Sequence, residues 1–150
     1  MTVRFNHVGH CVHDLERSTR FYCDLLGFTV ERELRPPDEP SARLLGLEPP
    51  LGMTAVYLSR DGFVLELLHY SAPGRTQPRR VRAMDEPGLT HLSVSVEDID
   101  AVCEGVAGLG GEVVAGTHVG SAVFIRDPDG QLIELLPMAY RRQLDERGFS

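Results

Sequence analysis

Three histidines stand within seven residues near the N-terminus, at His7, His10 and His13 in the stretch HVGHCVH. An imidazole can bind a divalent metal or move a proton, so each of these side chains could do chemistry. Their spacing fits neither a helical pair of metal ligands nor a zinc-finger motif. The local sequence therefore does not show which histidine is functional.

The chain repeats itself, and the repeat supplies a comparison for these histidines. The segment HVGHCVHDLE, from His7, is similar to HLSVSVEDID, from His91. Each is a short alternating strand that opens with histidine and closes in acidic residues able to cap a helix. Further on, VYLSRDGFVLELL (residues 56–68) aligns with VFIRDPDGQLIELL (residues 123–136), with one extra residue in the second turn. The alignment pairs His7 with His91 and Glu66 with Glu134.

Alternation along a strand predicts the face on which each side chain lies. In the second half His91 lies opposite an apolar face, formed by Leu92, Val94 and Val96. By repeat symmetry His7 points where His91 points. We expect His10 to face the helix layer as a structural residue and His13 to lie at the entrance of the helix.

Two glutamates interrupt apolar strands at matching positions, in VLELL and LIELL. A buried carboxylate costs several kcal/mol unless it is paired or bound to a cation. A single glutamate of this kind would be interpreted as facing water at a sheet edge. Here there are two, and each belongs to a half that opens with an inward histidine, which favours a metal site. Two imidazoles and two carboxylates suit Zn²⁺, Ni²⁺, Co²⁺, Mn²⁺ or Fe²⁺. The predicted ligands of one divalent ion are His7, Glu66, His91 and Glu134.

The elements that must position these ligands follow the repeat. Helices are predicted over residues 15–27 and 99–111, with Asp14 and Asp98 as N-caps. Hairpins are predicted with turns at Asp61-Gly62 and Asp129-Gly130, each preceded by a further strand, at residues 28–35 and 111–116. Each half is therefore expected to run strand–helix–strand–strand–strand.

Two segments break the symmetry. A Pro-rich insertion at residues 36–52, with a short helical turn at residues 41–45, is either a binding loop or a solvated excursion. A linker at residues 71–88 carries a basic cluster, which is either solvated or binds an anion. The members of this cluster are Arg79, Arg80 and Arg82.

The composition sets limits on the class of protein. A chain of 150 residues with 42% hydrophobic content predicts one domain with a proper core. The net charge of −7 argues against binding to nucleic acid or to a membrane surface. Without a signal peptide or an apolar run of about 18 residues, we expect a cytoplasmic protein. Its expected parts are a first module at about residues 3–70, the linker, a second module at about residues 89–138 and a tail at residues 139–150.

Over residues 3–138 the chain resembles the vicinal oxygen chelate superfamily, which includes glyoxalase I, extradiol dioxygenases and bleomycin-resistance proteins. The motifs that carry the resemblance are HVGHCVHDLERSTRFYCDLLGF, GLTHLSVSVEDID and DPDGQLIELL. The resemblance implies an α+β fold of two βαβββ modules, whose mixed sheets curl into a cup around a metal. It also implies a homodimer, in which modules are either kept within a chain or exchanged between chains.

The order His, Glu, His, Glu is similar to that of bacterial glyoxalase I. This resemblance implies a metal-dependent lyase or isomerase, with Zn, Ni or Co as the metal ahead of Mn or Fe. Its small substrate would bind the metal through adjacent oxygens, with Glu134 moving the proton and Glu66 as its counterpart. One alternative is a methylmalonyl-CoA-epimerase-like enzyme, in which Gln typically stands in the place of Glu66. Another is an extradiol-type dioxygenase, which uses two His and one Glu. The third is an antibiotic-binding resistance protein without catalysis.

Overall fold

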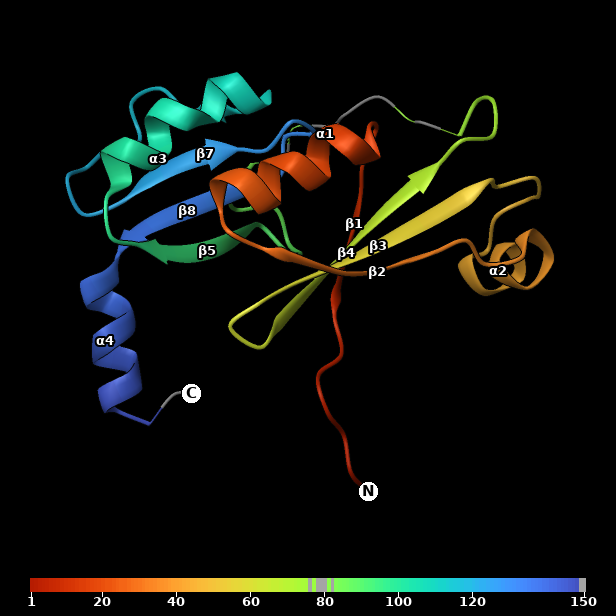
Figure 1. Cartoon of the computed structure of the whole chain (residues 1–150), viewed down its shortest axis with the longest axis horizontal. Helices are drawn as coiled ribbons and strands as arrows, with labels where there is room; N and C mark the ends of the chain where they lie inside the picture. The colour runs from red at the N-terminus through yellow and green to blue at the C-terminus, as the bar shows by residue number, and fades with distance from the viewer. Residues whose placement is uncertain (76, 78–80, 82, 149–150) are drawn as a thin grey trace. The chain divides into compact units, whose positions relative to one another are not determined.

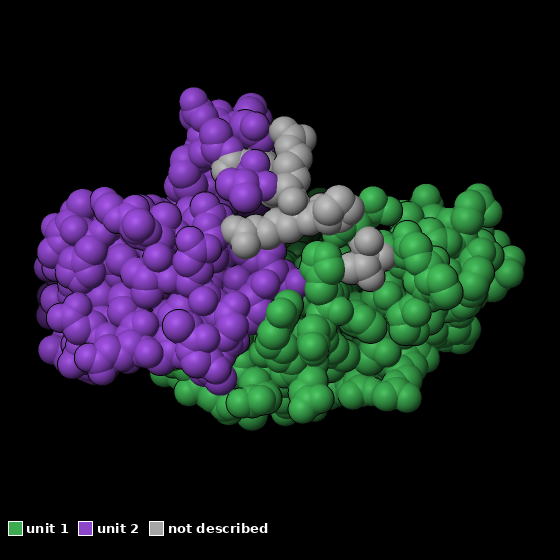
Figure 2. Space-filling view, turned by 90° about the horizontal axis from the view of Figure 1, so that it is seen from above, with its two compact units in different colours: residues 1–78 green, residues 79–150 purple. Residues whose placement is uncertain are grey.

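A computed structural model of the chain describes all residues except 76, 78–80, 82 and 149–150. The predicted basic cluster, Arg79, Arg80 and Arg82, lies outside the described residues. The chain divides into two compact units, Met1–Pro78 and Arg79–Ser150, which Figure 2 colours separately. Each unit has a sheet of its own.

The first unit is built around a four-stranded mixed sheet. Its elements in chain order are β1 (Val8–Cys11), α1 (Leu15–Arg20), β2 (Thr29–Leu34), α2 (Asp38–Leu45), β3 (Met53–Arg60) and β4 (Phe63–Tyr70) (Figure 1). A π-helical turn, Phe21–Leu25, continues α1. The strand order is β1-β4-β3-β2, with β1 parallel to β4 and the other pairs antiparallel.

The second unit repeats this architecture. Its elements are β5 (His91–Val96), α3 (Ile99–Val106), β6 (Glu112–Val113), β7 (Val123–Arg126), β8 (Leu132–Pro137) and α4 (Met138–Glu146) (Figure 1). The strand order β5-β8-β7-β6, with β5 parallel to β8, is the order of the first unit. The predicted α+β fold of two βαβββ modules is therefore confirmed.

Both helices begin as the sequence predicts. The carboxylate of Asp14 accepts a hydrogen bond from the backbone N of Arg17 at 3.0 Å, and that of Asp98 accepts one from Ala101 at 3.0 Å. These carboxylates satisfy backbone N–H groups that have no partner inside the helix. The first helical segment ends before Gly27, whose φ of 69° favours glycine.

The core of each unit lies between its sheet and its helix. In β4, Leu65 and Leu67 are fully buried on either side of Glu66, and in β8, Ile133 and Leu135 are fully buried on either side of Glu134. The helix α1 packs on β3 and β4, and α3 packs on β6, β7 and β8. Because side chains alternate along a strand, this packing directs both glutamates to the opposite face of their sheets.

The two hairpin turns differ in how they are stabilised. In the first, Asp61 and Gly62 both have positive φ, 49° and 78°, as a two-residue hairpin turn requires. In the longer second turn, Gly130 has φ 86°, and the buried Asp127 accepts hydrogen bonds from the backbone N of Asp129 and Gln131 at 3.0 and 2.7 Å. Both turns occur where the sequence predicts them.

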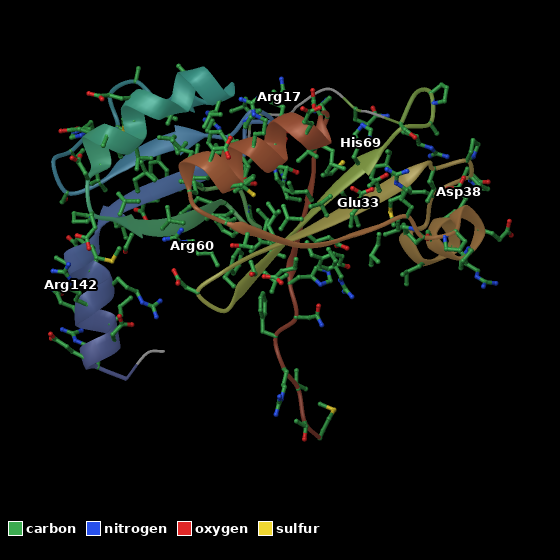
Figure 3. All side chains as sticks on the ribbon, in the orientation of Figure 1. Arg17, Glu33, Asp38, Arg60, His69 and Arg142 are labelled. Atoms are coloured by element: carbon green, nitrogen blue, oxygen red, sulfur yellow. The ribbon has the colours of Figure 1, made fainter. Side chains whose placement is uncertain are left out.

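Two helices lie outside the repeat. The helix α2 begins three residues before the predicted helical turn, because Pro40 lies in its first turn, where a missing N–H is tolerated. The carboxylate of Asp38, labelled in Figure 3, accepts hydrogen bonds from the backbone N of Leu51 and Gly52, both at 3.0 Å, and so connects the two ends of the insertion.

The expected tail forms α4, in which Arg142 donates to Glu97 at 3.1 Å. In the described part of the chain, no helix has the length and apolar character needed to cross a membrane.

Candidate metal centre

The first unit brings His7 and Glu66 together. The parallel pairing of β1 and β4 aligns Gly9 with Glu66, so His7, two residues before Gly9, lies on the same face as the glutamate. The distance from His7 Nε2 to Glu66 Oε2 is 3.1 Å. The Glu66 side chain is only 12% exposed, whereas the His7 side chain is 32% exposed, so the carboxylate is the better shielded partner of the pair.

The second unit brings His91 and Glu134 together in the same way. Here Ser93 aligns with Glu134, and His91 stands two residues before Ser93. The distance from His91 Nε2 to Glu134 Oε2 is 3.7 Å, and the glutamate is 24% exposed. The strand-facing prediction therefore holds for both pairs.

The remaining histidines of the opening stretch are directed elsewhere. The ring of His10 packs edge-on against the buried Tyr22, with 6.3 Å between ring centroids. This contact confirms that His10 faces the helix layer. His13, which is exposed at the start of α1, lies with Nε2 3.0 Å from the backbone O of Gln77.

The other ring nitrogen of each site histidine is also occupied. His7 Nδ1 lies 2.6 Å from the side-chain O of Asn6, and His91 Nδ1 lies 2.9 Å from the hydroxyl of Thr90. The Asn6 oxygen accepts hydrogen bonds, so this contact suits the tautomer with the proton on His7 Nδ1, which leaves a lone pair at Nε2. That lone pair faces a carboxylate oxygen, so a cation between them would stabilise both atoms.

These distances are compatible with metal binding. Two ligands at about 2.1 Å from one Zn²⁺ can be at most about 4.2 Å apart. Both His–Glu distances, 3.1 and 3.7 Å, are below this limit. The donor set of imidazole nitrogen and carboxylate oxygen is also the one that borderline divalent ions prefer. Within each unit, the residues present therefore fit a divalent metal.

A tyrosine that the sequence analysis did not single out lies beside the first pair. Tyr57 of β3 is aligned with Glu66, and its ring meets the His7 ring edge-on at 5.5 Å. Its hydrogen bond with Glu66 raises the pKa of the Tyr57 hydroxyl, and burial adds to the rise, whereas Arg32 opposes it. The Arg32 guanidinium lies 4.4 Å from the centre of the Tyr57 ring. The Tyr57 side chain therefore lies beside both members of the His7–Glu66 pair.

The second pair has different neighbours. Phe124 of β7, aligned with Glu134, meets the His91 ring edge-on at 5.4 Å. A phenylalanine has no hydroxyl, and here the Ser93 hydroxyl donates to Glu134 Oε2 at 2.8 Å. The repeat alignment already pairs Tyr57 with Phe124, and this difference was the signal that could have identified Tyr57.

Comparisons with known proteins bear on this geometry. The family described as the Glyoxalase/Bleomycin resistance protein/Dioxygenase superfamily matches residues 4–135. The chain is 31% identical over 138 residues to a probable lactoylglutathione lyase of Synechocystis, covering 87% of this chain and 92% of the relative. It is also 31% identical over 143 residues to an ethylmalonyl-CoA/methylmalonyl-CoA epimerase of Cereibacter sphaeroides, covering 90% and 98%. Among solved structures, the trypanothione-dependent glyoxalase I of Leishmania major matches with a TM-score of 0.66 and 26% identity, over 99% of this chain and 100% of that one.

Proposed function

The chain belongs to the Glyoxalase/Bleomycin resistance protein/Dioxygenase superfamily, and from that premise we propose that it is a metal-dependent lyase or isomerase of glyoxalase type. The proposed ligands of its divalent metal, Zn²⁺, Ni²⁺ or Co²⁺, are His7, Glu66, His91 and Glu134. One observation carries the proposal: each unit sets a histidine Nε2 against a glutamate Oε2 at the same position of the repeat, 3.1 Å apart in one unit and 3.7 Å in the other.

In this proposal the side chains hold the ion and leave room for a substrate with adjacent oxygens. A bound divalent metal polarises a carbonyl oxygen and stabilises the negative charge that forms when a neighbouring carbon loses its proton. Asn6 and Thr90, at Nδ1 of the two histidines, orient the imidazole rings so that each Nε2 faces its glutamate.

The proton is moved by a glutamate. We assign this role to Glu134, because it lies farther from its histidine than Glu66 does and is more exposed, 24% against 12%. A more exposed carboxylate is more accessible to a substrate carbon. Glu66 then acts from the opposite side of the substrate or remains a ligand.

An epimerase of acyl-CoA type is the second candidate. The ethylmalonyl-CoA/methylmalonyl-CoA epimerase of Cereibacter sphaeroides is 31% identical to the chain, as is the probable lactoylglutathione lyase of Synechocystis. Both reactions remove and return a proton beside a carbonyl, so both could use the same pair of carboxylates. The glutamate at position 66, where the epimerases typically carry glutamine, favours the lyase.

Exchange of a substrate proton with solvent tests the proposal for both candidates. The Ni²⁺-loaded protein is incubated in D₂O with S-lactoylglutathione or with methylmalonyl-CoA, and deuterium uptake is followed by mass spectrometry. We expect uptake into one of the two substrates, which is lost in Glu134→Gln. Metal-loaded protein that exchanges no proton of either substrate would contradict the assignment.

A further inference from the structure

The two units supply a hydroxyl to their glutamates from different strands. Cross-strand register places Gly9 and Tyr57 on either side of Glu66, and Ser93 and Phe124 on either side of Glu134. Position for position, Gly9 corresponds to Ser93 and Tyr57 to Phe124. The first unit therefore has its hydroxyl on β3, and the second has its hydroxyl on β5.

The contacts of Tyr57 hold its ring beside the pair of His7 and Glu66. The His7 ring meets Tyr57 edge-on at 5.5 Å, and the Arg32 guanidinium stacks at 4.4 Å from its ring centre. A cation over an aromatic face is attracted to it. Tyr57 is also the cross-strand neighbour of Glu66, so the two side chains lie on the same face of the sheet, and the tyrosine hydroxyl is the group that β3 offers to the carboxylate.

We infer that Tyr57 is a positioning residue of the metal centre, which orients Glu66 as Ser93 orients Glu134. The inference rests on the proposed function, because it assigns Glu66 and Glu134 to the metal. Hydrogen bonds to a ligating carboxylate fix its orientation, and their loss typically weakens metal binding about 10- to 100-fold. Arg32 contributes by holding the tyrosine ring.

The repeat itself provides the experiment, because the hydroxyl can be moved from one strand to the other. Tyr57→Phe keeps the ring and makes the position identical to Phe124. Gly9→Ser then installs a hydroxyl where the second unit has Ser93. A Cβ at Gly9 would lie 3.6 Å from Glu66 Oε2 and 3.6 Å from Leu68 Cδ1, which is ordinary contact.

The measurement is the Ni²⁺ dissociation constant of the full chain, by competition with a chromophoric chelator, together with the melting temperature of the metal-free protein. We expect Tyr57→Phe to weaken binding at least about tenfold and Gly9→Ser in that background to restore most of the loss. Tyr140→Phe, which removes an exposed tyrosine hydroxyl from α4, is the control and should leave the constant unchanged.

The reciprocal exchange in the second unit gives an independent arm if Tyr57→Phe does not fold. Ser93→Ala should weaken Ni²⁺ binding, and Phe124→Tyr in that background should restore it. Unchanged affinity in Tyr57→Phe, or a loss that Gly9→Ser leaves in place, overturns the inference while the proposed function stands. A wild-type protein that binds no Ni²⁺ overturns both.

Discussion

At the scale of single residues, His7 differs from His10 and His13 in the contacts of its ring. Its Nε2 lies 3.1 Å from a carboxylate, whereas His10 packs on an aromatic ring and His13 reaches a backbone carbonyl. We therefore expect His7→Ala to abolish metal binding, because it removes a direct ligand. His10→Ala and His13→Ala should keep wild-type metal content by elemental analysis. Equal loss of metal in all three variants would show that the assignment of strand faces is wrong.

The two glutamates should also separate by their roles. Glu134→Gln removes the proposed base, so turnover should fall about 10²- to 10⁴-fold. Glu66→Gln should act mainly on metal affinity, with a smaller loss of turnover once metal is saturating. The measurement is kcat at saturating Ni²⁺ for both variants. Equal losses of kcat would contradict the different roles proposed for the two carboxylates.

Some residues of the site were accessible to sequence reasoning and others were not. The pairs His7–Glu66 and His91–Glu134 could be predicted, because repeat symmetry and alternation depend only on spacing. Arg32 could not, since its alignment with Tyr57 depends on a register shift between Val30 and Arg32 in β2. A bulge of this kind changes which residues face each other and leaves no mark in the alternation.

At the scale of elements, the aspartate caps are the local signals on which the helices depend. Asp14→Ala removes the acceptor for Arg17 N at the start of α1 and should lower the free energy of unfolding by about 1 kcal/mol. Asp14→Asn, which keeps an oxygen acceptor, is the matched control and should stay near wild type. Urea unfolding of the metal-free protein measures both variants. A loss in Asp14→Asn as large as in Asp14→Ala would show that the hydrogen bond is not what stabilises the helix.

The elements were predictable where a local signal marks them. Caps and turn residues predict α1, α3 and both hairpins. The helix α4 has no fully buried residue, so no strong apolar stripe distinguishes it from a polar tail. The strand expected over residues 111–116 is reduced to Glu112–Val113, an exposed edge with little burial to extend it.

At the scale of the whole molecule, the family resemblance predicts a two-fold homodimer, which a mass measurement in solution at micromolar concentration would test. A strictly monomeric mass would contradict this prediction. The linker at residues 71–88 is long enough for units to be kept within a chain or exchanged between chains.

Mixing two inactive variants, His7→Ala and Glu134→Ala, distinguishes these arrangements. If the units are exchanged, the heterodimer collects both lesions in one site and leaves the other site intact, so activity should partly return. If each site is built within one chain, every site carries a lesion and the mixture stays inactive. The assay is turnover of the mixture after joint unfolding and refolding, with each variant refolded alone as the control.

The proposed metal centre requires both His–Glu pairs to bind the same ion. This requirement is tested by titrating the metal-free protein with Ni²⁺ in a calorimeter. The matched variants are His7→Ala and His91→Ala, one in each unit. We expect one tightly bound ion per chain in the wild type and loss of that ion in both variants. Two ions per chain, or tight binding that survives at one unit when the histidine of the other is removed, would contradict it.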